Sequence, residues 1–306
     1  VAGLLLSVSI PHAFTDRGLL FAGAFVFMQV ARSAFAMWVV RAESPGLARN
    51  FQRILIWMLL SGVFWISGVL LEGNQRLACW AVALAIELVS PSLFFWVPGL
   101  GASTLDDWNV EANHMAERCG LFVIIALGES LLVTGATFAR LSWSLAGFAA
   151  FVVAVLGSIA MWWIYFDSGA ERAHERIAHA RDPGRHARLA YTYIHVLMIA
   201  GVIVSAVADE LVLMHPGHAT TGAVITMIAG PFLFLLGCAL FKWVMSDRPL
   251  PPFSHMGGML LLLILLPAAL EQVFSGLILG ALTTLILLIV AGWEAVSLGR
   301  GPMPNV

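Results

Sequence analysis

Long hydrophobic runs separated by short polar connections are the main pattern along this chain of 306 residues. A helix needs about 20 apolar residues to cross a bilayer, whereas the strands of a membrane barrel are shorter and alternate in polarity. The runs therefore predict helices, at residues 19–40, 54–72, 77–98, 117–138, 143–167, 189–213, 220–245, 256–273 and 275–298. The opening VAGLLLSVSI is too short to span a bilayer and is interpreted as the end of a partial helix.

The connections are mostly short and carry Pro, Gly or Asn, which favours one compact bundle. The predicted fold is all-α: a polytopic transmembrane helical bundle of about nine spans plus a partial N-terminal helix, in a single domain over residues 1–306. Because Val1 is not an initiator methionine and no basic segment precedes the first run, we expect an N-terminally truncated or processed chain.

Composition supports a membrane protein. The chain is 60% hydrophobic and 11% charged, whereas soluble domains are about half apolar and a quarter charged. A net charge of −2 argues against a nucleic-acid partner. The expected partners are membrane lipids and other membrane subunits or a second copy of the chain. Three cysteines, Cys79, Cys119 and Cys238, lie inside apolar runs and are interpreted as small core residues.

The basic residues predict the orientation. One set of alternate connections carries eleven of them, and the opposite set carries only Arg17, Arg76 and Arg140. Because basic loops stay on the cytoplasmic side of bacterial membranes, the C-terminus is expected to be cytoplasmic.

The segment HMAERCGLFVIIALGES, residues 114–130, places ionisable groups in an apolar run. His114, Glu117 and Arg118 share one side of a helix start, as a cap and interfacial ion pair or as the cytoplasmic mouth of a pathway. Arg118 and Glu129 face nearly the same way, about 16 Å apart along the helix axis. A charge at the depth of Glu129 is expensive, so this carboxyl group is expected to be protonated, paired or in a wet cavity.

Two further spans carry ionisable groups at depth. Glu87 precedes Pro91 by four residues, so a kink is expected that frees a carbonyl beside the carboxylate. Pro231 and Pro267 would free carbonyls in the same way. Arg32 is the only basic residue deep inside a predicted span, and its expected partner is Glu87 or Glu129. That pair would be structural or would lock a transport site.

A semi-polar stripe follows helical spacing from Tyr191 through His195 and Ser205 to Asp209. His195 is interpreted as an interhelical histidine or as part of a proton relay. Asp209 and its neighbour Glu210 would mark the far side of the membrane, where they could simply be solvated. Together with the groups above, these residues predict a polar route across the bundle.

No Walker loop, HExxH, GxSxG, CxxC pair or dinucleotide glycine pattern occurs. The HxxE spacing of His114 and Glu117 could supply two metal ligands, but a single such pair is weak support. We therefore predict no cofactor and no metal. An enzyme, for example one acting on lipids or isoprenoids, is the least favoured class.

The 114–130 segment resembles the signature of the bacterial low-temperature-requirement A family, which has the pattern HxxERxGLFxIIxLGE. IPHAFTDRGLLFAGAFVFMQVAR, WWIYFD and YTYIHVLMIAGVIVSAVADE resemble other segments of that family. The family's early segment of ELFFDLVFV type is absent, so a site that needs its acid would be incomplete. The resemblance implies a multi-pass protein of the bacterial cytoplasmic (inner) membrane, but no substrate or reaction.

Two functional hypotheses follow. The first is a secondary transporter or a proton- or cation-coupled permease that uses intramembrane carboxylates. The alternative is a non-catalytic accessory or structural subunit of a membrane complex, whose polar residues hold helices together.

Overall fold

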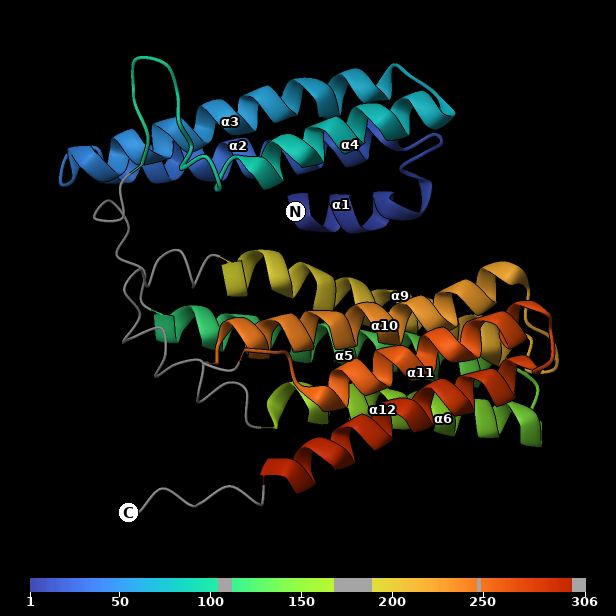
Figure 1. Ribbon diagram of the computed structural model, residues 1–306. Helices are drawn as coiled ribbons and strands as arrows, with labels where there is room; N and C mark the ends of the chain where they lie inside the picture. The colour runs from blue at the N-terminus through green and yellow to red at the C-terminus, as the bar shows by residue number, and fades with distance from the viewer. Residues whose placement is uncertain (104–111, 168–188, 247–248, 299–306) are drawn as a thin grey trace. The chain divides into compact units, whose positions relative to one another are not determined.

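The computed structural model describes residues 1–103, 112–167, 189–246 and 249–298 as helices joined by short turns (Figure 1). Within these residues the chain is all-α, as the hydrophobic runs predicted, apart from one isolated bridge between Val97 and Gly101. Eight of the described helical segments are long and apolar enough to cross a membrane. The prediction of a polytopic helical bundle is confirmed.

The chain divides into two compact units, Val1–Asn109 and Val110–Val306, which are described separately. The first unit contains α1 (Ala2–Ser9), the 3-10 turn η1 (Ile10–His12), α2 (Gly18–Val40), α3 (Pro45–Val69) and α4 (Gly73–Val89). Each α-helix packs mainly on the next one along the chain.

The described residues of the second unit form six long helices: α5 (Ala112–Arg140), α6 (Leu145–Phe166), α9 (His195–Met214), α10 (Thr221–Val244), α11 (Phe253–Leu270) and α12 (Gly276–Leu298). The π-helical turn η3 (Leu189–Ile194) leads directly into α9. The neighbours in space form a closed ring in the order α5, α6, α12, α11, α10, α9. Successive helices alternate in direction, so the C-terminal ends of α6, α10 and α12 lie with the N-terminal ends of α9 and α11 (Figure 1).

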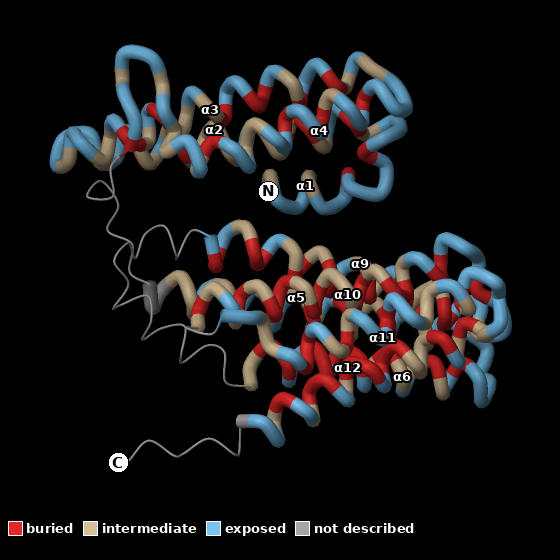
Figure 2. Tube along the Cα trace, in the orientation of Figure 1, coloured by how far each residue is buried: buried red, intermediate tan, exposed pale blue. Residues whose placement is uncertain are grey.

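Burial in the second unit is concentrated where the helices face one another (Figure 2). Large hydrophobic side chains are exposed on the outside, for example Ile125, Leu132 and Ile264. A soluble protein avoids apolar surface on this scale, whereas lipid chains accept it. The exposed apolar faces are therefore consistent with an integral membrane protein.

Glycines allow α9 and α10 to approach closely. A Cβ on Gly201 would lie 2.4 Å from the backbone nitrogen of Phe234, and one on Gly237 would lie 2.9 Å from that of Met198. In membranes, where the hydrophobic effect does not join helices, such small residues let the backbones pack and gain dispersion energy. The close packing of α9 against α10 therefore depends on glycines at the points of contact.

The predicted kink at Pro91 is wrong. The helix α4 ends at Val89, and Pro91 lies in the turn that follows. Pro91 has no N–H and cannot make the helical hydrogen bond to the Glu87 carbonyl, and here the helix stops instead of bending. The carbonyl of Glu87 accepts a hydrogen bond from the Ser90 hydroxyl at 3.0 Å. By contrast, Pro231 lies inside α10 and Pro267 lies inside α11.

In the first unit, Arg76 holds two turns together. Its guanidinium is buried and donates to the carbonyls of Leu71, Val69, Ala13 and Thr15 at 2.9–3.3 Å. Two of these carbonyls lie at the end of α3 and in the turn that follows it, and two lie in the turn that leads into α2. A planar guanidinium with five donors can satisfy all four at once.

Replacing Arg76 with alanine should lower the free energy of unfolding by about 3 kcal/mol, because it leaves buried carbonyls without donors. Unfolding by sodium dodecyl sulfate in mixed micelles would measure the change. Arg140→Ala is the matched control, since Arg140 is exposed and its guanidinium donates to the Ala136 carbonyl. Equal losses in the two variants would contradict this role for Arg76.

Candidate functional site

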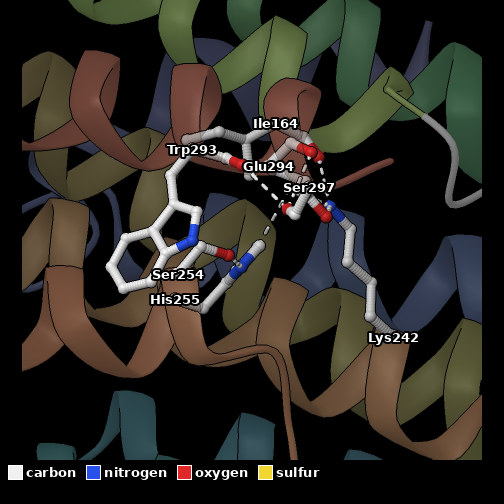
Figure 3. Close-up of polar contacts among 7 residues, drawn as sticks. All are labelled: Ile164, Lys242, Ser254, His255, Trp293, Glu294 and Ser297. Carbon is white, nitrogen blue, oxygen red and sulfur yellow. Dashed lines mark hydrogen bonds and ion pairs between the residues drawn. The ribbon is translucent and has the colours of Figure 1, made fainter. Parts of the chain in front are cut away.

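A buried ion pair joins three helices of the second unit (Figure 3). Lys242 of α10 donates to both carboxylate oxygens of Glu294 of α12 at 2.7 Å and to the carbonyl of Ile164 of α6 at 2.8 Å. The side chains of Lys242 and Glu294 are 11% and 9% exposed. An ammonium has three hydrogens, so these contacts use its whole donor capacity.

The local helix ends explain why these two groups need each other. Lys242 lies in the last turn of α10, where the negative end of the helix dipole favours a cation. Glu294 lies near the same kind of end in α12, where the dipole disfavours an anion. The Lys242 ammonium therefore compensates a carboxylate that its own helix does not stabilise.

His255 of α11 adds a titratable group to this cluster. Its ring is completely buried, with Nδ1 3.1 Å from the Ser254 hydroxyl and Nε2 3.9 Å from Oε2 of Glu294. Nε2 has no hydrogen-bond partner among the described residues. We name Lys242, Glu294 and His255 the ion-pair cluster. The cluster therefore combines an ammonium, a carboxylate and an imidazole.

His195 lies at the same end of the second unit, between α6 and α9. Its Nδ1 is 2.8 Å from the Ala190 carbonyl, so Nδ1 carries the hydrogen, and Nε2 accepts the Tyr165 hydroxyl at 2.9 Å. The rings of Tyr191 and Phe241 pack against the imidazole. His195 is thus an interhelical histidine, and its role in a proton relay stays a prediction.

A small cavity of about 30 Å³ lies in the second unit, between α6, α9, α10 and α12. Its polar lining comes from Asp209 and Ser205 of α9 and from Thr283 and Thr284 of α12. Asp209 is the only ionisable residue in the lining. A cavity of this size can hold one or two water molecules or one dehydrated ion.

One of the two pairings predicted for Arg32, the one with Glu87, does not form. In the first unit, the Glu87 carboxylate accepts hydrogen bonds from the Ser61 hydroxyl at 2.5 Å and the Trp65 indole at 2.8 Å. Arg32 is exposed and donates to Gln29 of its own helix at 2.8 Å. The predicted ion pair between Arg32 and Glu87 is therefore wrong, because neutral donors already satisfy the carboxylate.

The signature helix α5 presents three charged residues away from the core of the second unit. Glu129 is exposed, as are Glu117 and Arg118. Glu129 shares its face of α5 with the exposed Ile125 and Leu132. Hence Glu129 and the buried His195 do not meet within this unit. The side chain of His114 lies outside the described residues.

The sequence contained signals for the ion-pair cluster that periodicity analysis missed. Lys242 is the only lysine of the chain, and the run FKWV places it in an apolar helix. Glu294 in AGWEAV and His255 in FSHMGG also interrupt apolar runs. Lys242 and Glu294 are 52 residues apart, so no helical spacing relates them. Among the described residues, no group of three or more His, Cys, Asp or Glu side chains could hold a metal ion.

Comparisons with known proteins agree with the resemblance in the 114–130 segment. The family model described as bacterial low temperature requirement A protein (LtrA) matches residues 1–292. An uncharacterized protein of Rhizobium meliloti (strain 1021), RA0937, is 38% identical over 303 residues, which cover 97% of this chain and 72% of that protein. No solved structure matches. The chain therefore belongs to the bacterial low temperature requirement A (LtrA) family of membrane proteins.

Proposed function

We propose that this LtrA-family protein is a secondary transporter coupled to protons or another cation, with its coupling groups inside the second unit. The observation that carries the proposal is the ion-pair cluster. Ionisable groups buried in membrane spans are costly and commonly mark ion or proton pathways. Here a lysine, a glutamate and a histidine lie together, and the histidine has a ring nitrogen free to exchange a proton.

The geometry links the charge of Glu294 to helix packing. A proton bound by the carboxylate neutralises it, so Lys242 loses its counter-ion and keeps only uncharged acceptors, such as the Ile164 carbonyl. The contact between α10 and α12 is then weakened. A change of charge that biases helix packing is what an ion-coupled conformational cycle requires.

We further propose that the protein resides in the bacterial inner membrane with its C-terminus in the cytoplasm, in contact with lipids and with other subunits or a second copy. The excess of basic residues in one set of connections supports this orientation. Five of those residues, in the connection 168–188, lie outside the described residues, as do Arg248 and Arg300. In this orientation the ion-pair cluster lies at the cytoplasmic end of the second unit.

Proteoliposomes with an imposed pH gradient and an internal pH dye would test the proposal. The wild type should dissipate the gradient when a membrane potential drives ion movement, and Glu294→Gln should reduce the rate at least about tenfold, since the amide cannot exchange the proton. Glu271→Gln is the control, because Glu271 is an exposed carboxylate at the end of α11. No flux above protein-free vesicles in the wild type would contradict transport.

The alternative function is an accessory or structural subunit. The observation that favours it is that Lys242 donates all its hydrogens to α6 and α12, as a purely structural lock would. The double variant Lys242→Met/Glu294→Leu separates the two functions. It replaces the ion pair by an apolar contact that can still hold the helices together. A structural subunit should therefore keep its cellular role, whereas a transporter should lose its transport activity.

A further inference from the structure

We infer that the cavity around Asp209 is a binding site for a dehydrated monovalent cation, with Na⁺ as the best fit. This inference rests on the proposed function, because it names the class of ion that the transporter would couple or carry. We name the cavity and its polar lining residues Asp209, Ser205, Thr283 and Thr284 the Asp209 site.

The lining supplies oxygen atoms of the kinds that hard cations prefer. Asp209 contributes a carboxylate, and three neighbouring residues contribute hydroxyls. Thr283 donates its hydroxyl hydrogen to the Gly280 carbonyl at 3.0 Å, and Thr284 donates its own to the Val153 carbonyl at 3.4 Å. With their hydrogens engaged elsewhere, both threonine oxygens keep lone pairs that can face a cation.

Two groups at the Asp209 site lack partners. Ser205 is 6% exposed, and its buried hydroxyl has no hydrogen-bond partner among the described residues. Asp209 is half-buried and makes no hydrogen bond or ion pair with the described residues. Buried hydroxyls are nearly always satisfied, so a cation bound to the Ser205 oxygen would account for its lack of a partner, and the Asp209 carboxylate would supply the opposite charge.

A proline inside α10 lies beside the cavity. Pro231 has no N–H, so the carbonyl of Met227 lacks its usual helical donor, and both residues line the cavity. A carbonyl that no helical N–H uses keeps its lone pairs for another partner. The packing around Ser205 is tight, since a Cβ on Gly230 would lie 2.5 Å from its hydroxyl oxygen.

Charge and size select the class of ion. Asp209 is the single ionisable group in the lining, so one monovalent cation neutralises the site, whereas a divalent ion would leave an excess positive charge. The lining contains no His or Cys, which argues against zinc and copper. The volume of about 30 Å³ admits an ion without its hydration shell.

Thermal unfolding of the purified chain in detergent would test the inference, with NaCl replacing choline chloride at constant ionic strength. NaCl should raise the Tm by about 3 °C or more, because an ion that binds only the folded state stabilises it. Asp209→Asn should require about tenfold more NaCl for the same rise. Glu210→Gln is the matched control, since the neighbouring carboxylate does not line the cavity and should leave the response unchanged.

Ser205→Ala keeps the test decisive if Asp209→Asn does not fold, and it should weaken the NaCl response severalfold. An equal response to NaCl and choline chloride in the wild type, or an unchanged response in both site variants, would overturn the cation site. Proteoliposome flux distinguishes this failure from failure of the proposed function. Flux without Na⁺-specific stabilisation would contradict only the cation site. Na⁺-specific stabilisation without any flux would contradict only the proposed transport function.

Discussion

Replacing Lys242 with methionine should lower the free energy of unfolding by about 3–5 kcal/mol, which is the usual cost of removing one partner of a buried ion pair. The variant keeps the length of the side chain but leaves the Glu294 carboxylate without the cation that binds both of its oxygens. It also removes the donor to the Ile164 carbonyl. Unfolding of the purified protein by sodium dodecyl sulfate in mixed micelles would measure the loss.

Adding Glu294→Leu to Lys242→Met should reverse most of this loss of stability. In Lys242→Met/Glu294→Leu no uncompensated charge remains, and apolar replacements of buried ion pairs are often neutral or stabilising. In a double-mutant cycle, the double variant should therefore lose less stability than the sum of the two single variants. The coupling energy then has the opposite sign to the single losses. Additive losses in the double variant would show that the two side chains act independently, contrary to the contacts seen here.

The other large effect is expected at the crossing of α9 and α10. Gly201→Ala should cost about 3 kcal/mol or more, because the new Cβ would lie 2.4 Å from the backbone nitrogen of Phe234 and 2.8 Å from its Cα. A backbone atom cannot move aside as a flexible side chain can, so the two helices must separate. Unfolding in mixed micelles, combined with near-ultraviolet circular dichroism, would report both stability and packing.

Gly292→Ala in α12 is the control for this prediction, since nothing lies within 4 Å of the Cβ that it adds. This variant should be neutral or gain up to about 1 kcal/mol from the better helix propensity of alanine. The prediction fails if the two glycine variants are equally stable, because the close approach of α9 to α10 would then not limit packing.

The sequence predicted the helices well because a helix that crosses the bilayer must contain an apolar run as long as the bilayer is thick, and such runs are visible in the sequence. The run 220–245, for example, corresponds to α10 (Thr221–Val244). Two boundaries were in error by nine residues: α3 begins at Pro45 instead of 54, and α4, expected at 77–98, ends at Val89. There the apolar character continues past the helix, while Pro91 and the left-handed backbone of Phe94 and Phe95 belong to the turn.

The candidate site was predicted only in part. Asp209 and His195 were identified because a carboxylate and an imidazole in an apolar stripe are rare, and the structure places one at a cavity and the other between two helices. Arg32 and Glu129 carried the same signal but are exposed on their own units. Depth along a helix is visible in a sequence, whereas the direction of a side chain around the helix depends on its neighbours.

By itself the sequence determined that this protein is a helical membrane protein of the LtrA type and roughly which segments form its helices, because these properties depend on local hydrophobicity and on a contiguous signature. Only the tertiary structure decided which polar groups meet. Lys242, Glu294 and His255 come from three helices, and Asp209 lines the same cavity as Thr284, which is more than 70 residues away along the chain. The physical reason is that partners for buried charges are chosen by helix packing in space, which no spacing along the chain encodes.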